Sequence, residues 1–156
     1  MLRMRINVAL ALMGLMTPGS PHLRGAQAVG PDNATIVNSG STNRAGFLIT
    51  VDRSGVAERT SVPRRRSGSP QEQALPVRKT LPKALADRFY ANLTAAKPLS
   101  SLPDVHCPKS ASFGTALTVK FGEDQSPDLS CGDGGSAVLR DLIRDANEIV
   151  ALFDSE

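Results

Sequence analysis

The sequence predicts an exported α+β domain of two layers, with an antiparallel sheet of about four strands and two helices on one of its faces. Three observations lead to this fold class. The N-terminal segment has the features of an export signal, several later stretches alternate apolar and polar residues as strands do, and two stretches repeat apolar residues at helical spacing. The expected element order is β-β-α-β-β-α.

Residues 1–28 have the layout of a secretory signal peptide. Two arginines precede an apolar run of eleven residues, and the stretch 26–28 offers the small residues that a signal peptidase accepts. The run is shorter than the ~20 apolar residues of a membrane-spanning helix, so we expect no transmembrane segment. An uncleaved amphipathic anchor is the alternative. A flexible leader at 29–34 and a single domain at 35–156, in the periplasm or outside the cell, are expected to follow.

The net charge gives no reason to expect a nucleic-acid partner. The chain has 18 Lys and Arg against 15 Asp and Glu, a net charge of +3. Residues 1–28 contain three arginines and no acidic residue, so their removal leaves 15 residues of each sign. The alkaline isoelectric point therefore belongs to the targeting segment.

The first half of the domain is expected to contain a hairpin and a long loop. In "GFLITVD" at 46–52 the apolar residues alternate with other side chains, a turn at 52–55 contains Gly55, and 56–62 returns as the second strand. Residues 35–37 suggest a short edge strand. The Pro-rich and Arg-rich stretch 63–79 has no helical or strand period, and we expect it to be a mobile loop.

Two helices are indicated by apolar residues at helical spacing. The first has an apolar residue every four positions from Leu81 to Leu93, with Thr80 as the expected N-cap and Pro82 in its first turn; Lys97-Pro98 ends it. The second is expected to start after a Ser136 cap and to run to about residue 153, with one apolar and one charged side.

Between the helices, "FGTALTVKF" at 113–121 is expected to form the clearest strand, because Phe113, Leu117 and Phe121 fall on one face. A turn at 122–127 follows, and "DLSC" begins to return. This element order, together with "SFGT…SPDLSC", resembles small exported bacterial proteins of uncharacterised function over about residues 35–153. The resemblance implies an α+β fold and no activity.

The chain has two cysteines, Cys107 and Cys131, which we expect to form a disulfide, as an even cysteine count in an exported protein usually indicates. A turn near residues 123–124 would not place them opposite each other. The bond is therefore expected to join the connector after the first helix to the segment that enters the second. A metal site and free or intermolecular thiols are the alternatives; only His106 remains as a further N or S ligand.

The motifs that resemble catalytic or metal sites are incomplete. "VHC" and "CGDGGS" resemble parts of chymotrypsin-like proteases, but Gly134 stands where the nucleophile would be, and Ser136 lies beyond the glycines. "DQSPD" at 124–128 lacks the glycine and glutamate of a calcium-binding EF-hand. We expect no catalytic residue, metal or cofactor. Two glycosylation acceptor patterns begin at Asn33 and Asn92.

Charge is unevenly distributed along the chain. Residues 53–88 carry a net charge of +6 and residues 121–156 a net charge of −7. Arg64, Arg65 and Arg66 are therefore the candidate contact for an acidic protein or an anionic surface. The alternative is a solvated loop whose charge is balanced by an acidic helix face.

These observations favour a non-enzymatic binding or structural domain of unknown partner. A second hypothesis is an inhibitor of an extracellular hydrolase that acts through an exposed loop, 63–79 or 122–127. A third is a small hydrolase that uses His106 with Asp104 or Asp128.

Overall fold

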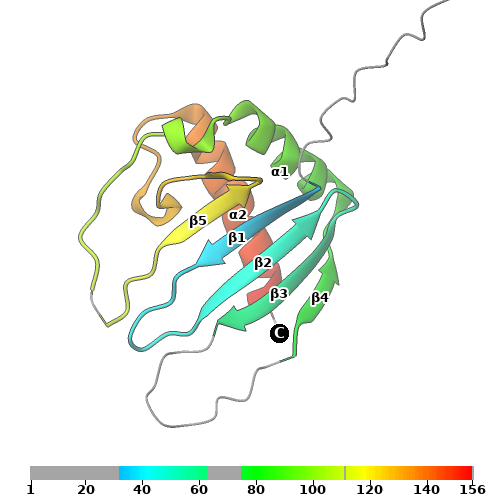
Figure 1. The fold of residues 1–156 in the computed structure, drawn as a ribbon, viewed down its shortest axis with the longest axis horizontal. Helices are drawn as coiled ribbons and strands as arrows, with labels where there is room; N and C mark the ends of the chain where they lie inside the picture. The colour runs from blue at the N-terminus through cyan, green and yellow to red at the C-terminus, as the bar shows by residue number, and fades with distance from the viewer. Residues whose placement is uncertain (1–31, 63–74, 111, 156) are drawn as a thin grey trace, which may run out of the picture.

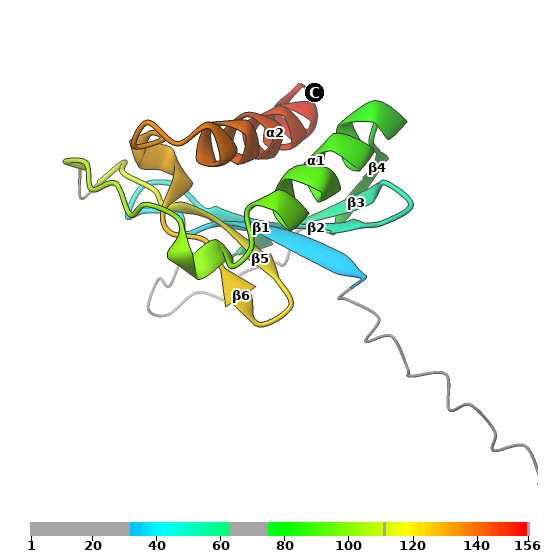
Figure 2. The ribbon, with the colours of Figure 1, turned by 90° about the horizontal axis from the view of Figure 1, so that it is seen from above.

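The computed structural model describes residues 32–62, 75–110 and 112–155, which form an antiparallel sheet with both helices on one of its faces (Figures 1 and 2). Within these residues the sheet has six strands in the order β4-β3-β2-β1-β5-β6. The α+β class is confirmed. The expected four strands and the order β-β-α-β-β-α are wrong, because the observed order is β-β-β-β-α-β-β-α.

Strands β1 (Asn33–Asn38), β2 (Gly46–Asp52) and β3 (Val56–Val62) form a meander, and β1 also pairs with β5 (Leu117–Phe121). The hairpin of β2 and β3 is confirmed. The strand expected at 35–37 is present, but its expected edge position is wrong, because β1 lies between β2 and β5. Its Ile36 is opposite Ile49 on one side and Val119 on the other, and all three side chains are fully buried under the helices.

Strand β4 (Val77–Thr80) lies in the stretch that was expected to be a mobile loop. Its four residues pair with β3 at the sheet edge, and Arg78 forms an ion pair of 2.7 Å with Glu58 on the neighbouring strand. Three of the four residues are exposed, so neither periodicity nor apolar content indicated the strand. The rest of the expected loop, 63–74, lies outside the described residues.

Helices α1 (Lys83–Ala95) and α2 (Ala137–Asp154) cover the buried face of the sheet. The N-cap of α1 is Pro82, without a side-chain hydrogen bond, and the predicted cap Thr80 instead ends β4. The predicted stop before Lys97-Pro98 is confirmed. The cap of α2 is also confirmed, because the Ser136 hydroxyl accepts the Leu139 N–H at 3.3 Å.

The strand expected at 113–121 begins only at Leu117. Phe113 is 61% exposed, and the Gly114 N–H donates to the Ser110 carbonyl at 2.6 Å in a tight turn before the strand. After β5 come the two-residue strand β6 (Asp124–Gln125) and the 3-10 turn η2 (Leu129–Cys131), which replaces the expected return strand. A second 3-10 turn, η1 (Leu99–Ser101), follows α1.

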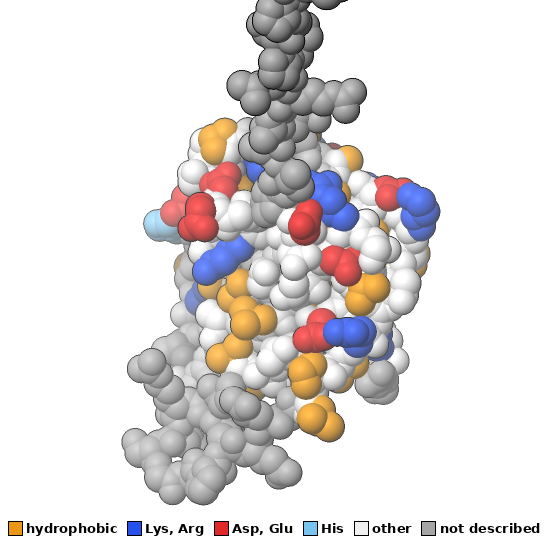
Figure 3. Space-filling model, turned by 45° about the vertical axis from the view of Figure 1, so that its right-hand side comes forward, with side chains coloured by type: hydrophobic (Ala, Val, Ile, Leu, Met, Phe, Trp, Pro, Cys, Tyr) orange, Lys and Arg blue, Asp and Glu red, His pale blue; other side chains and the backbone are white. Residues whose placement is uncertain are grey.

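The uneven charge of the sequence is partly neutralised by the fold. Arg59 of the basic segment pairs with Asp154 of the acidic one at 2.6 Å, and Arg88 pairs with Asp145 at 2.7 Å and with Glu148. On the face shown in Figure 3, acidic and basic side chains are interspersed. The described residues therefore favour internal balance of charge over one extended surface of a single sign.

Candidate binding site

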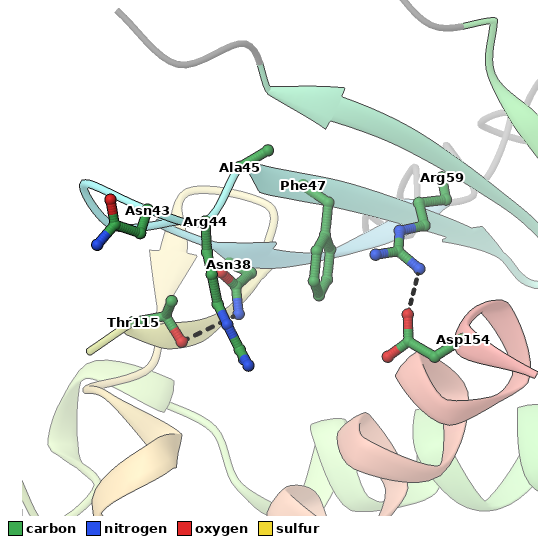
Figure 4. Close-up of a pocket in the computed structure, with 8 residues that line it drawn as sticks. All are labelled: Asn38, Asn43, Arg44, Ala45, Phe47, Arg59, Thr115 and Asp154. Carbon is green, nitrogen blue, oxygen red and sulfur yellow. Dashed lines mark hydrogen bonds and ion pairs between the residues drawn. The ribbon is translucent and has the colours of Figure 1, made fainter. Parts of the chain in front are cut away.

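A polar pocket of about 330 Å³ lies at the end of the sheet where the β1–β2 hairpin turns (Figure 4). It is built from the hairpin, the neighbouring strand, the connector before β5 and the last residue of α2. The residues that line it are Asn38, Asn43, Arg44, Ala45, Phe47, Arg59, Thr115 and Asp154. We call it the hairpin-end pocket.

The hairpin loop that forms one wall is held by its own hydrogen bonds. The Asn38 side-chain oxygen accepts the Gly40 N–H at 2.9 Å, and the Ser41 N–H donates to the Arg44 carbonyl at 2.8 Å. Gly40 has a φ of +65°, and a Cβ there would lie 2.5 Å from the Gly46 nitrogen, so glycine is required. The loop therefore has a defined shape before any ligand binds.

The same loop is tied to the connector before β5. The Ser41 hydroxyl and the Asn43 N–H both donate to the Ser112 carbonyl, at 2.9 Å and 3.1 Å. The Asn38 amide donates to the Thr115 hydroxyl at 3.4 Å, which is a long hydrogen bond. Two segments more than 70 residues apart in sequence thus hold the pocket together.

Two guanidinium groups and one aromatic ring give the pocket its chemistry. The Arg59 guanidinium carbon lies 4.4 Å from the centre of the Phe47 ring, and its Nη1 forms the 2.6 Å ion pair with Asp154. In Figure 4 the Arg44, Phe47 and Arg59 side chains all extend from the sheet toward the helix layer. Among the described residues, Arg44 has no acidic partner. The pocket therefore contains one balanced and one unbalanced positive charge.

Sequence reasoning missed this pocket. Its one available signal was Arg59, which shares the helix-facing side of β3 with the buried Ala57 and lies opposite the buried Ile49. A cation at a position where a strand usually carries an apolar side chain indicates a partner or a cavity. Arg44 gave no signal, because it lies in a polar loop.

The disulfide between Cys107 and Cys131 is formed, with the two Cα atoms 5.3 Å apart. It joins the connector after α1 to the turn η2, which precedes α2, so the predicted placement is confirmed. The alternatives of a metal site and of free thiols are not observed for these two cysteines. In the described part of the chain, no group of three or more His, Cys, Asp or Glu side chains is placed to hold a metal ion.

A cluster around Asp128 strengthens the same junction. Its carboxylate forms an ion pair with Lys109 and accepts the Leu117 N–H at 3.1 Å and the Ser130 N–H at 3.0 Å. Partial burial acts to raise the pKa of Asp128, but the hydrogen bonds from Lys109, Ser130 and Leu117 outweigh it and lower this pKa to about 2. The cluster therefore favours an ionised carboxylate with a structural role.

The residues of the hydrolase hypothesis lie near one another, but the described part of the chain adds no nucleophile to them. His106 is 86% exposed and lies 3.3 Å from Asp104, whereas Asp128 is occupied by Lys109 and by the Ser130 hydroxyl. His106 and Asp128 line the same shallow pocket beside the disulfide. No hydroxyl group hydrogen-bonds to His106 among the described residues.

The protease-like segment "CGDGGS" at 131–136 forms the turn that leads into α2 and caps its first residues. The Asp133 carboxylate accepts the Gly135 N–H at 2.8 Å and pairs with Arg140 at 2.8 Å, while Ser136 caps the helix. The hydrogen bond from Gly135 is the largest cause of the lowered pKa of Asp133, and the one from Arg140 is the next. These contacts give each group a local structural role.

Two predicted contact segments remain, the arginine cluster at 64–66 and the turn at 122–127. Arg64, Arg65 and Arg66 are outside the described residues. The turn at 122–127 is partly packed: the Asp124 carboxylate accepts the Leu99 N–H at 2.5 Å and the Ser100 N–H at 3.0 Å, and Ser126 is only 3% exposed. Gly122, Glu123 and Gln125 of the same turn are exposed, so the inhibitor hypothesis stays a prediction.

One buried carboxylate fixes the two helices against each other. Asp145 of α2 is fully buried and accepts hydrogen bonds from Arg88 at 2.7 Å and from the Asn92 amide at 2.6 Å, both on α1. The amide of the second glycosylation pattern is therefore engaged inside the fold. By its spacing Asp145 belongs to the charged side that the sequence predicts for this helix, so its burial is not indicated by the pattern.

Comparisons with protein-family models and with curated proteins gave no match. Among the described residues, no helix combines the length and the apolar composition needed to cross a membrane. Assignment of a function therefore depends on the geometry of the sites described above.

Proposed function

We propose that this chain is an exported, disulfide-stapled domain that acts by binding and not by catalysis, with the hairpin-end pocket as its ligand site. The observation that carries the proposal is Arg44. Its guanidinium faces a pocket whose loop is already ordered, and it has no acidic partner among the described residues. A cation held in this way is suited to a partner from outside the chain.

The disulfide supports export. Disulfides form and persist in oxidising compartments such as the periplasm and the cell exterior, and the Cys107–Cys131 bond closes the junction before α2. The signal-like segment 1–28 agrees with this destination, although it lies outside the described residues.

The contacts of the reactive side chains support binding over catalysis. Asp128, Lys109 and Ser130 hydrogen-bond to one another, and Asp133 and Ser136 hold the start of α2. Groups of this kind need a free reacting atom to act as nucleophile or base, and here their hydrogen bonds go to the fold itself.

The test begins with expression of the full chain and recovery of the protein from the periplasm or the medium. Mass spectrometry without reductant should give a mass 2 Da below that of the reduced form, because the disulfide removes two hydrogens. This oxidised protein is then assayed against ester, phosphate, peptide and glycoside substrates.

We expect export, an intact disulfide and no turnover above the buffer rate. Retention in the cytoplasm, or turnover that His106→Ala abolishes, would overturn the proposal. Turnover that His106→Ala leaves unchanged, and that stays with the protein through purification, would overturn the proposal that the domain is not an enzyme.

A further inference from the structure

We infer that the hairpin-end pocket binds a carboxylate carried on an apolar organic group, and that Asp154 competes with this carboxylate for Arg59. The inference rests on the proposed function, because it names the ligand class of the same site. It follows from the charge of the pocket, from its one aromatic wall and from the position of Asp154.

The charge of the pocket suits a monoanion. Arg44 and Arg59 supply two positive charges and Asp154 one negative charge, so the lining formed by the described residues carries a net charge of +1. A carboxylate would balance this charge. A phosphate dianion would leave excess negative charge beside Asp154, at the C-terminal end of α2, where the helix dipole also disfavours anions.

The shape of the donors also fits a carboxylate. A guanidinium group is planar and presents parallel N–H donors that match two carboxylate oxygens. Arg59 donates from Nη1 to Asp154, and its other guanidinium N–H groups can still donate. Arg44 makes no side-chain hydrogen bond among the described residues, so all of its N–H donors are available. The Asn38 amide, with its single long hydrogen bond, is a further neutral donor in the lining.

The rest of the ligand would contact Phe47. Its ring extends toward the helix layer beside Arg44 and Arg59, and it is kept in place by the stacked Arg59. The volume of about 330 Å³ lies at the lower end of the range for small-molecule sites. It therefore suits one small organic acid, or the last residue of a peptide, since both present a carboxylate next to an apolar group.

Asp154 acts as an internal competitor. It is the last residue of α2, its side chain is 59% exposed, and it holds Arg59 through a single 2.6 Å contact. The Arg59 side chain is 23% exposed, so the pair is only partly open to solvent, but Asp154 can turn outward into water and leave the guanidinium to an incoming carboxylate. Removal of the Asp154 charge should therefore strengthen anion binding.

The test is a titration of the oxidised, exported protein with benzoate, followed through its ¹⁵N–¹H amide signals. Benzoate has the carboxylate and a flat apolar body, and benzamide is its neutral counterpart. We expect benzoate to bind at the hairpin-end pocket with a dissociation constant of about 1–10 mM. Benzamide and inorganic phosphate should bind at least about fivefold more weakly.

Three variants separate a specific site from general attraction of anions. Arg44→Gln should weaken benzoate binding about tenfold or more, because a charge-assisted hydrogen bond is lost. Asp154→Asn should strengthen it about threefold. Arg78→Gln is the matched control, since it removes the same charge from the exposed edge strand β4, and it should leave binding unchanged.

Acetyl-dialanine with a free or an amidated C-terminus distinguishes the two sources of a carboxylate. Tighter binding of the free-acid peptide than of benzoate indicates a polypeptide end, and the reverse indicates a small organic acid; both support the inference. Equal binding of benzoate and benzamide, or preference for phosphate, overturns the carboxylate assignment but leaves the proposed binding function in place. Weaker binding by Asp154→Asn overturns the competition. Failure of every probe at the pocket overturns both proposals.

Discussion

The most informative perturbation of the fold is Asp128→Asn, because it removes the charge at the centre of the junction between β5, η2 and the connector. In the folded protein the pKa of Asp128 is lowered from 3.8 to about 2. One pKa unit corresponds to about 1.4 kcal/mol, so the ionised carboxylate contributes about 2 kcal/mol to the free energy of unfolding. Its side chain is 24% exposed, which limits screening by solvent.

The sign of the pH dependence follows from the lowered pKa. The stabilisation by the Asp128 carboxylate is fully present when the pH is above 3.8, the pKa in the unfolded chain. It is lost as the pH falls through the pKa of about 2 in the folded protein. Wild type should therefore exceed Asp128→Asn by about 2 kcal/mol at pH 6. The difference should fall toward zero at pH 2, while other carboxylates titrate in both proteins and cancel.

Urea unfolding at pH 6, 4, 3 and 2 measures this difference, and circular dichroism is the suitable probe because the chain contains no Trp. Asp104→Asn is the control: its carboxylate is 59% exposed and, within the described part of the chain, pairs with the exposed His106 alone, so it should change stability by less than about 0.5 kcal/mol. A difference between wild type and Asp128→Asn that stays constant from pH 6 to pH 2 would refute the assignment of the stabilising charge to Asp128.

Three further perturbations test the rest of the fold. Asp145→Asn should lower the free energy of unfolding by about 2 kcal/mol, because the buried carboxylate that accepts from Arg88 and Asn92 loses its charge, while Arg88 keeps Glu148; an unfolding midpoint in urea equal to wild type contradicts this. Replacing both Cys107 and Cys131 by Ser opens a loop of sequence separation 24 and should cost about 3.5 kcal/mol by loop entropy, as measured against the oxidised protein. Ile36→Ala should cost about 2–5 kcal/mol and Leu48→Ala less than about 1 kcal/mol, since only the first is fully buried; similar thermal shifts for the two would argue against the central position of β1.

The elements with strong apolar periodicity could be predicted from the sequence. Helix α2 was predicted with its cap, because Ser136 and the apolar stripe from Leu139 to Phe153 indicate the same start and the same buried face. The disulfide was predicted from the cysteine count and the expected compartment, and its placement from the turn between the cysteines. These are local signals, and the fold agrees with them.

Elements that depend on distant partners were predicted poorly. β1 is only six residues long, and its central position depends on pairing with β5, more than 75 residues away in sequence. β4 forms because the backbone of β3 offers an open edge, a feature that its own exposed side chains do not encode. Phe113 continued the strand pattern of β5, but the hydrogen bond from Gly114 to Ser110 turns the chain before the strand begins.

The candidate site was the least predictable part, because it unites residues from the β1–β2 hairpin, β3, the connector before β5 and α2. Arg44 is an ordinary loop cation until the hairpin places it beside Phe47 and Arg59. The ion pair of Arg59 with Asp154 joins residues 95 positions apart, and sequence-level charge counting showed only that the two regions have opposite sign. By contrast, the motifs that resembled catalytic sites were visible in the sequence and proved to form caps and junctions.

Carboxylate binding at the hairpin-end pocket should be visible in the arginine side-chain Nε–H signals during a benzoate titration of the oxidised protein. We expect the Arg44 and Arg59 signals to shift together and to saturate at the same concentration, while those of Arg78 and Arg140, on other parts of the surface, stay in place. Equal, unsaturated shifts of all four arginines would show general screening by the added anion and would contradict binding at this pocket.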